Sequence, residues 1–158
     1  MLLGKEGALW WNVRMNWWEK SLDELNDEQW EALCDGCGLC CMHKFEDEDT
    51  GEVLYTDVAC RLFDVATCHC TDYANRSVQV PECLRIRQFE PEEFAWLPPT
   101  CAYRLRFEER PLFDWHPLVS GNQDSVHRAA ISMQGRCVSE AEVDADEVSL
   151  HIIEPASD

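Results

Sequence analysis

The sequence lacks an uninterrupted apolar run of the length that a membrane helix needs. Such a helix takes roughly 20 consecutive apolar residues, and here Lys, Arg, Asp or Glu interrupts every apolar stretch. The N-terminal apolar segment, residues 7–13, contains Asn12 and leads to Arg14 and paired Trp residues rather than to a small-residue cleavage site. We therefore expect a soluble, cytoplasmic protein with no membrane partner.

Basic residues are scarce as well. The 13 Lys and Arg residues oppose 31 Asp and Glu residues, which gives a formal net charge of −18. A charge of this sign repels the phosphate backbone of nucleic acids and the surface of anionic lipids. The composition therefore argues against nucleic acid as a partner, and the acidic residues are interpreted as a solvated surface.

The common catalytic motifs are also missing. The chain contains no G-x-S-x-G, phosphate-binding loop, H-E-x-x-H or strand-linked G-x-G-x-x-G. A cysteine nucleophile has no obvious His partner, and a thioredoxin-like dithiol would need a βαβ context that residues 30–41 do not show. No catalytic residue is assigned from the sequence.

What the chain does have is ten cysteines in 158 residues. Without an export signal these thiols are expected in a reducing compartment, where dense cysteine usage indicates metal ligation rather than disulfides. The alternative, that they are ordinary buried cysteines acting as small hydrophobes, fits their density and spacing poorly.

Four of these cysteines lie within eight residues, at Cys34, Cys37, Cys40 and Cys41. Thiolates this close repel one another unless a cation neutralises them, and C-x2-C is a common spacing for two ligands of one ion. The run also resembles the loops of iron–sulfur proteins, although the C-P ending of bacterial ferredoxins is absent. Because adjacent sulfurs cannot easily bind one ion, Cys41 indicates a second metal or a bridge.

Cys60, Cys70, Cys83 and Cys101 follow at wide spacings and complete a set of eight. Eight thiolates suffice for two four-thiolate sites, or for one cubane cluster and one zinc. The predicted metal ligands are Cys34, Cys37, Cys40, Cys41, Cys60, Cys70, Cys83 and Cys101.

The other candidate side chains have less specific signals. Cys68 and Cys137 are left outside the set because Cys70 better leads the C-T-D-Y segment and Cys137 stands alone. His43 and His69 lie beside cysteines, but exposed His next to ligand loops is common and they are not included.

His116 and His127 are candidate general bases or ligands, with Asp114 able to orient His116. A packed loop histidine is the simpler interpretation of each.

The local patterns predict an α+β fold. Helical spacing and an Asn26/Gln29 capping box predict two short helices within 17–33, and a hairpin is expected from strands 42–45 and 53–56 around an acidic turn. That turn lacks the ligand spacing of a calcium loop. Short helices are expected at 91–96 and 102–107, and residues 113–121 are expected to form a loop.

We therefore expect a small single domain of short helices around a β-hairpin, with an irregular middle region held together by cysteine-ligated metal. The predicted divisions are an N-terminal extension at 1–16, the metal-binding domain at 17–139 and a frayed acidic C-terminal tail at 140–158.

Several segments resemble the YcgN-like proteins, from about residue 17 to residue 139. They are LCDGCGLCC at 33–41, EDEDT at 46–50, VACR at 58–61, TCHCTDY at 67–73, WLP at 96–98, TCAYRL at 100–105 and WHPL at 115–118. These proteins belong to a group named for its CxxCxxCC motif and described as zinc- or iron-chelating. The resemblance implies the same eight cysteines as the metal site, with no assigned biochemical role.

A similar cysteine pattern in flagellin lysine methylases is associated with an iron–sulfur cluster, which favours iron over zinc by analogy. Methylation does not transfer, because the C-x3-C-x2-C motif of radical enzymes is absent. Our main hypothesis is therefore a metal-binding protein with a role in electron transfer, sensing or structural support. The alternatives are a metal-dependent enzyme that uses His116 or His127, and a structural zinc module that presents its acidic surface to a protein partner.

Overall fold

The capping box predicted at Asn26 begins the first α-helix of the computed structural model, which describes residues 16–154. The backbone N–H of Gln29 donates to Asn26 Oδ1 at 2.8 Å, and the backbone N–H of Asn26 donates to Gln29 Oε1 at 3.0 Å. Helix α2 (Asp27–Leu33) is thereby confirmed. The first of the two helices expected here forms instead as two 3₁₀ turns, η1 (Trp17–Glu19) and η2 (Leu22–Glu24).

The predicted hairpin is also confirmed. Strand β1 (Met42–Glu46) pairs antiparallel with β2 (Val53–Ala59). In the acidic turn, Asp47 Oδ1 accepts hydrogen bonds from the backbone N–H groups of Asp49 and Thr50, at 2.8 and 3.0 Å. This carboxylate therefore closes the turn by bonding the backbone, a role that needs no calcium ion.

Strand β2 is the centre of a four-stranded sheet rather than half of an isolated hairpin. Its second edge pairs in parallel with β5 (Val138–Ser139) and, further along, antiparallel with β6 (Ile152–Ile153). The expectation of frayed backbone beyond residue 139 is therefore wrong for residues 140–154. The physical reason is that the open edge of β2 offers unpaired backbone groups, which the C-terminal segment satisfies. The domain boundaries themselves stay a prediction.

The middle and later parts of the chain consist of short elements. Residues 113–121, expected to be a loop, contain helix α5 (Pro117–Ser120), which has Pro117 at its first position and Gly121 beyond its end at φ +75°. Those two residues are helix boundary signals that the sequence interpretation passed over. The remaining elements are η3 (Leu39–Cys41), β3 (Phe63–Asp64), β4 (His69–Cys70), η4 (Tyr73–Asn75), α3 (Arg76–Gln79), η5 (Ile86–Gln88), η6 (Pro91–Trp96), α4 (Ala102–Phe107), α6 (Ser125–Arg128), η7 (Glu140–Glu142) and η8 (Ala145–His151).

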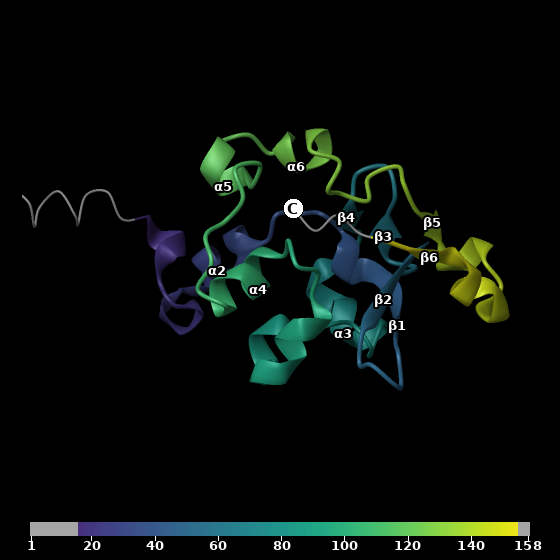
Figure 1. The fold of residues 1–158 in the computed structure, drawn as a ribbon. Coiled ribbons are helices and arrows are strands. Elements are labelled where there is room, and N and C mark those ends of the chain that lie inside the picture. The colour runs from purple at the N-terminus through teal and green to yellow at the C-terminus, as the bar shows by residue number, and fades with distance from the viewer. Residues whose placement is uncertain (1–15, 155–158) are drawn as a thin grey trace, which may run out of the picture.

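Two apolar cores lie at opposite sides of the molecule, as Figure 1 shows from the positions of α2 and α4 on one side and the sheet on the other. The helical core contains Trp30, Leu33 and Tyr103, and the sheet core contains Tyr55 and Phe63. Residues 34–41 connect them, because Leu33 belongs to the helical core while Cys37 and Leu39 belong to the sheet core.

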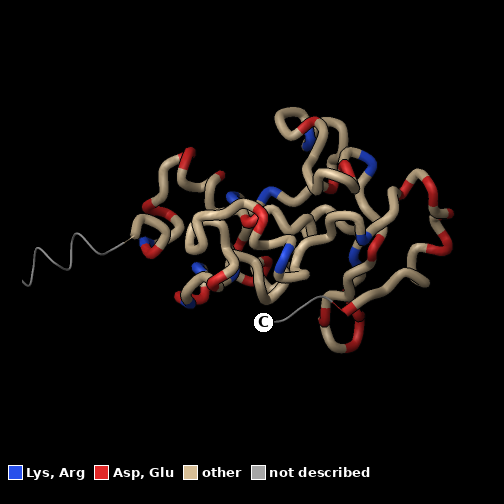
Figure 2. The backbone as a smooth tube through the Cα atoms, turned by 90° about the horizontal axis from the view of Figure 1, so that it is seen from above, with Lys and Arg blue, Asp and Glu red and all other residues tan. Residues whose placement is uncertain are grey.

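Acidic side chains mark the outer parts of the chain. The end formed by η7 and η8 carries acidic residues and no Lys or Arg, and it stands out in red at the right of Figure 2. Short helices and a small mixed sheet confirm the α+β class. Within residues 16–154, no helix has the length and apolar character needed to span a membrane.

Candidate metal centre

The cysteine loop begins where α2 ends. Gly36 and Gly38 take positive φ values of +78° and +81°, which L side chains rarely adopt, and so the loop can turn sharply at both positions. Gly38 is also crowded: a Cβ there would lie 2.7 Å from Cζ of Phe63. Glycine is therefore needed at Gly36 for its backbone conformation, and at Gly38 for both its conformation and the close approach of Phe63.

Cys40 and Cys41 form an adjacent pair within η3. The Cys41 thiol donates a hydrogen bond to the Cys40 sulfur, and this bond together with the charge of Lys44 lowers the pKa of Cys40 to about 7 despite burial. The same hydrogen bond, followed by burial, raises the pKa of Cys41 far above its usual value. A proton is therefore lost more readily from Cys40 than from Cys41.

One group of cysteines is influenced by the charges of both Asp35 and Cys40. Burial, then the charge of Asp35, raises the pKa of Cys37, and the charges of Cys40 and Cys101 add to it. Although Cys34 is exposed overall, desolvation of its thiol and the same charges raise its pKa. Cys101, at the N-cap of α4, has its pKa raised to about 12 by burial and then by Asp35. Cys34, Cys37 and Cys101 therefore share one electrostatic environment with Cys40.

A second group of cysteines acts on Cys41 or on one another. The charges of Cys83 and Cys60 both act on Cys41, and Cys83 in turn senses Cys40, Cys60 and Cys70. The backbone N–H of Cys60 donates to the carbonyl oxygen of Cys41 at 2.9 Å. Cys60, Cys70 and Cys83 are thus gathered around the Cys40–Cys41 pair from three distant parts of the chain.

All ten cysteines are free thiols. Electrostatic influences among the eight predicted ligands, which also reach Cys68, indicate one region of the fold around Cys40 and Cys41. Soft thiolate donors of this kind suit zinc and iron–sulfur clusters. In the part of the chain that the structure describes, no three Cys, His, Asp or Glu side chains converge closely enough to hold an ion as they stand. The donor chemistry fits a metal centre, and the assignment of the individual ligands stays a prediction.

The two cysteines left out of the set are bonded differently. The Cys68 thiol donates to the carbonyl oxygens of Gly36 and Cys37, at 3.3 and 3.5 Å, and the Cys137 thiol donates to that of Met133 at 3.4 Å. Both residues are buried. A thiol that donates to a backbone carbonyl keeps its proton, and this supports a structural role for both.

The histidines do not face the sulfurs as ligands. His116 is buried and uses both ring nitrogens on the backbone: Nδ1 accepts from the N–H of Leu118 at 3.0 Å, and Nε2 lies 2.7 Å from the carbonyl oxygen of Leu33. His127 Nδ1 lies 2.6 Å from Ser132 Oγ, and His43 pairs with Glu140. His116 therefore has no nitrogen left for acid–base chemistry or for a metal.

Sequence reasoning missed two charged residues beside the sulfurs. Asp35, only 7% exposed, accepts the backbone N–H of Cys37 at Oδ1, 2.9 Å away. Lys44 Nζ donates to the carbonyl oxygens of Cys40 and Met42, at 2.9 and 2.8 Å, and its ammonium charge lies near the thiolates of the pair. The sequence could have pointed to Asp35, because it lies between two predicted ligands. It could not have pointed to Lys44, because the strand pattern places that residue only on a face of the sheet.

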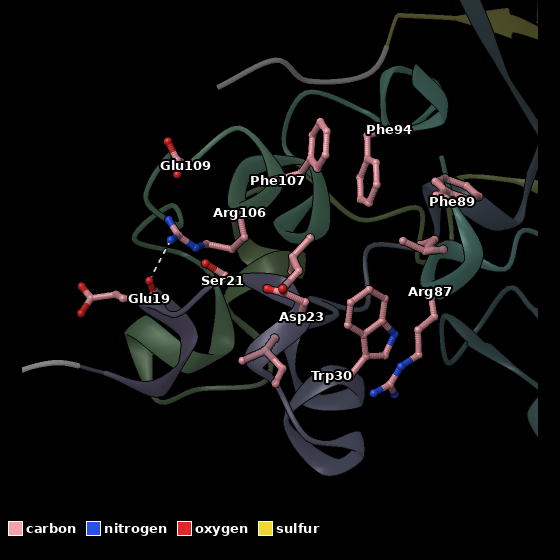
Figure 3. Close-up of a pocket in the computed structure, with 13 residues that line it drawn as sticks. Glu19, Ser21, Asp23, Trp30, Arg87, Phe89, Phe94, Arg106, Phe107 and Glu109 are labelled. Atoms are coloured by element: carbon pink, nitrogen blue, oxygen red, sulfur yellow. Dashed lines mark hydrogen bonds between the residues drawn. The ribbon is translucent and has the colours of Figure 1, made fainter. Parts of the chain in front are cut away.

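One cleft lies away from the cysteines. It encloses about 600 Å³ and is lined mainly by the helical side of the molecule. Figure 3 shows the rings of Phe94 and Phe107 stacked within it, Trp30 beside Arg87, and the hydrogen bond from Arg106 to the backbone of Glu19. A second cleft of about 380 Å³ is likewise lined by no cysteine or histidine. Neither cleft brings a substrate next to the sulfurs.

Comparison with known proteins gives one family. The family model CxxCxxCC, described as "Putative zinc- or iron-chelating domain", matches residues 33–102. A UPF0260 protein of Allorhizobium ampelinum is 54% identical over 131 residues, which cover 83% of this chain and 82% of the relative. A UPF0260 protein of Azotobacter vinelandii is 54% identical over 137 residues, or 87% of this chain and 92% of the relative. No solved structure matches the chain significantly.

The matched region contains the CxxCxxCC run itself and extends through Cys101 to Ala102, so it spans all eight of the cysteines gathered around Cys40 and Cys41. Family membership therefore supports a zinc- or iron-binding role for this neighbourhood. This chain belongs to the UPF0260 family of proteins with a CxxCxxCC domain.

Proposed function

We propose that this protein binds iron through the thiolates of its eight clustered cysteines, most simply as an iron–sulfur centre, with zinc as the alternative metal. The observation that carries the proposal is that the eight predicted ligands, all free thiols from distant parts of the chain, influence one another electrostatically around the Cys40–Cys41 pair. Cys68 also senses Cys40, but its thiol, like that of Cys137, donates to backbone carbonyl oxygens. When bound, such a centre supplies one-electron redox chemistry if it contains iron, or a redox-inert cross-link if it contains zinc.

The adjacent pair favours a polynuclear centre. The charge of Cys40 acts on Cys34, Cys37, Cys101 and Cys83, whereas Cys41 is influenced by Cys60 and Cys83. Two neighbouring sulfurs whose surroundings are only partly shared can serve different metal atoms without straining toward a single ion. A cluster or a pair of metals accommodates this division better than one zinc ion does.

The metal centre would also hold the two cores together. Cys101 packs against the helical core and Cys41 against the sheet core. A metal bound by sulfurs from both sides cross-links regions that are otherwise joined by short, irregular segments, and its binding free energy then adds to folding free energy. This placement favours the structural zinc module as the second candidate, with the acidic end at η7 and η8 facing a protein partner.

We place the protein in the cytoplasm, because free thiols persist in a reducing compartment.

The enzyme alternative has less support. His116 is fully engaged by the backbone, and neither cleft is lined by cysteine or histidine. The Nδ1 atom of His127 is bonded to Ser132 Oγ, and Nε2 has no hydrogen-bond partner among the described residues. Neither nitrogen of His127 is hydrogen-bonded to a cysteine there. No arrangement of acid, base and substrate cleft emerges from these residues.

The test is anaerobic purification followed by visible absorption and metal analysis of the wild type, a Cys37→Ser, Cys40→Ser variant and a Cys137→Ser control. We expect a brown wild type with iron and acid-labile sulfide, loss of both in the double variant, and retention in the control because Cys137 bonds only a carbonyl. A colourless wild type with stoichiometric zinc would show that the bound metal is zinc rather than iron. A wild type without metal and with freely titrating thiols would overturn metal binding itself.

A further inference from the structure

Asp35 carries a buried carboxylate oxygen with nothing to bond. The residue lies between Cys34 and Cys37 and is only 7% exposed. Its Oδ1 accepts the backbone N–H of Cys37, but Oδ2 is buried and has no hydrogen-bond partner among the described residues. Leaving a buried polar atom unpaired costs about 1–3 kcal/mol, and more for a charged group. A cation or a hydrogen-bond donor beside Oδ2 would remove this cost.

The nearby residues do not supply that donor. His116 is close enough for its charge to affect Asp35, yet its Nε2 is directed to the Leu33 carbonyl and its Nδ1 accepts from Leu118. Lys44 Nζ donates to two carbonyl oxygens. Among the described residues, the charge of Asp35 acts on the predicted sulfur ligands Cys34, Cys37 and Cys101, and also on Cys40.

A purely local role for Asp35 explains only half of the side chain. The hydrogen bond from Cys37 N–H to Oδ1 is an Asx turn, which stabilises the loop and which Asn or Ser can also form. A protonated carboxyl would donate from Oδ2 to an acceptor, and the described chain provides no acceptor within hydrogen-bond distance. The turn therefore accounts for Oδ1 and leaves Oδ2 unexplained.

We infer that Asp35 is a metal ligand through Oδ2, in the part of the centre that holds Cys37 and Cys101. This inference rests on the proposed function and deepens it, because it makes one part of the centre a mixed sulfur–oxygen site. Cys34 is adjacent to Asp35 and is therefore assigned to a different metal atom, by the same argument that separates Cys40 from Cys41. A carboxylate is a harder donor than a thiolate, and so the metal atom at Asp35 is expected to exchange more readily than the other.

X-ray absorption of the zinc-loaded, full-length wild type tests the inference without any substitution. We expect a Zn–O shell at about 2.0–2.2 Å beside the Zn–S shell at about 2.3 Å. A first shell of sulfur alone would overturn the role of Asp35 while leaving the proposed function intact. A wild type that binds no zinc and no iron would overturn both.

Two variants give an independent measurement. Asp35→Ser keeps a hydroxyl that can accept the Cys37 N–H and removes Oδ2. Asp47→Ser is the matched control, because Asp47 closes an equivalent Asx turn in the hairpin and is only partly buried. Zinc affinity is measured by competition with a chromophoric chelator. We expect the affinity of the weaker site to fall by about tenfold or more in Asp35→Ser, with no change in the control. Equal affinities in the two variants would contradict ligation by Asp35.

Discussion

His116 Nε2 lies 2.7 Å from the carbonyl oxygen of Leu33, across 83 residues of sequence. Since Nδ1 accepts from the backbone N–H of Leu118, the proton is on Nε2 and the ring donates to Leu33. Leu33 is the last residue of α2 and immediately precedes Cys34. One neutral histidine thus fixes the point at which the cysteine loop leaves the helical core.

Replacing His116 by Leu should destabilise the protein. The change leaves the Leu33 carbonyl and the Leu118 N–H without their partners in a buried setting, and we expect the free energy of unfolding to fall by about 2–4 kcal/mol. Urea denaturation of the reduced, metal-free protein measures it. His69→Leu, at an exposed position, serves as the control and should change stability by roughly 0.5 kcal/mol or less. A loss no larger than in the control would show that the His116 hydrogen bonds contribute little.

The same histidine predicts a pH dependence. Burial lowers the pKa of His116 below its ordinary 6.5, although the Leu33 hydrogen bond and Asp35 partly oppose the shift. Below about pH 6.5 the unfolded chain takes up a proton that the folded protein resists, so the free energy of unfolding should decrease as the pH falls from 6.5 through the folded pKa. His116→Gln cannot titrate and should lose less stability over this interval. Parallel curves for the two proteins between pH 7.5 and 5.5 would count against the shift.

Gly38→Ala should be costly for two reasons. The positive φ of +81° is unfavourable for Ala, and the new Cβ would lie 2.7 Å from the Phe63 ring. We expect a loss of about 2–4 kcal/mol, made up of the backbone cost and the overpacking cost. Gly51→Ala is a matched control, because φ is +74° there and nothing lies within 4 Å of the added Cβ. The difference between the two variants measures the Phe63 contact, and no difference would rule that contact out as a constraint.

Cys40 should react faster than Cys41 with alkylating reagents in the reduced, metal-free protein. With its pKa lowered to about 7 by the Cys41 hydrogen bond and by Lys44, roughly half of Cys40 is thiolate at pH 7, against a few per cent for an ordinary thiol. Iodoacetamide should therefore modify Cys40 before Cys41, as read by peptide mass spectrometry. Lys44→Met should slow this reaction and Lys20→Met, at an exposed position, should not. Faster alkylation of Cys41 would invert the assignment.

The C-terminal strand should contribute to stability. Deleting residues 151–158 removes β6, its pairing with Tyr55 and Thr56, and the contact of His151 Nδ1 with Asp57 Oδ1 at 2.8 Å. From the lost backbone hydrogen bonds and the partly buried Ile153, we expect unfolding to become easier by about 2–4 kcal/mol. Deletion of 155–158 alone keeps β6 and is the control. If both deletions behave alike, the domain ends before β6, as the sequence division at residue 139 predicts.

Local chemistry explains which elements could be predicted. The Asn26/Gln29 capping box, the acidic hairpin turn and helix α4 depend on residues close together in the chain, and all three form where the sequence indicates. The C-terminal segment was misjudged because its partner is the free edge of β2, about 100 residues earlier, and a two-residue strand has no periodicity of its own.

The sequence by itself determined the α+β class and the family, and it predicts a metal centre of clustered thiols, because cysteine spacing and turn chemistry depend on residues close together in the chain. Only the tertiary structure decided how the cysteines are grouped around Cys40 and Cys41, that His116 is a hydrogen-bond donor to Leu33 rather than a base, and that Asp35 has a buried oxygen without a partner. These properties arise from burial and from contacts between distant segments. Desolvation and proximity set the charge and bonding of each side chain, and neither can be read from residue order alone.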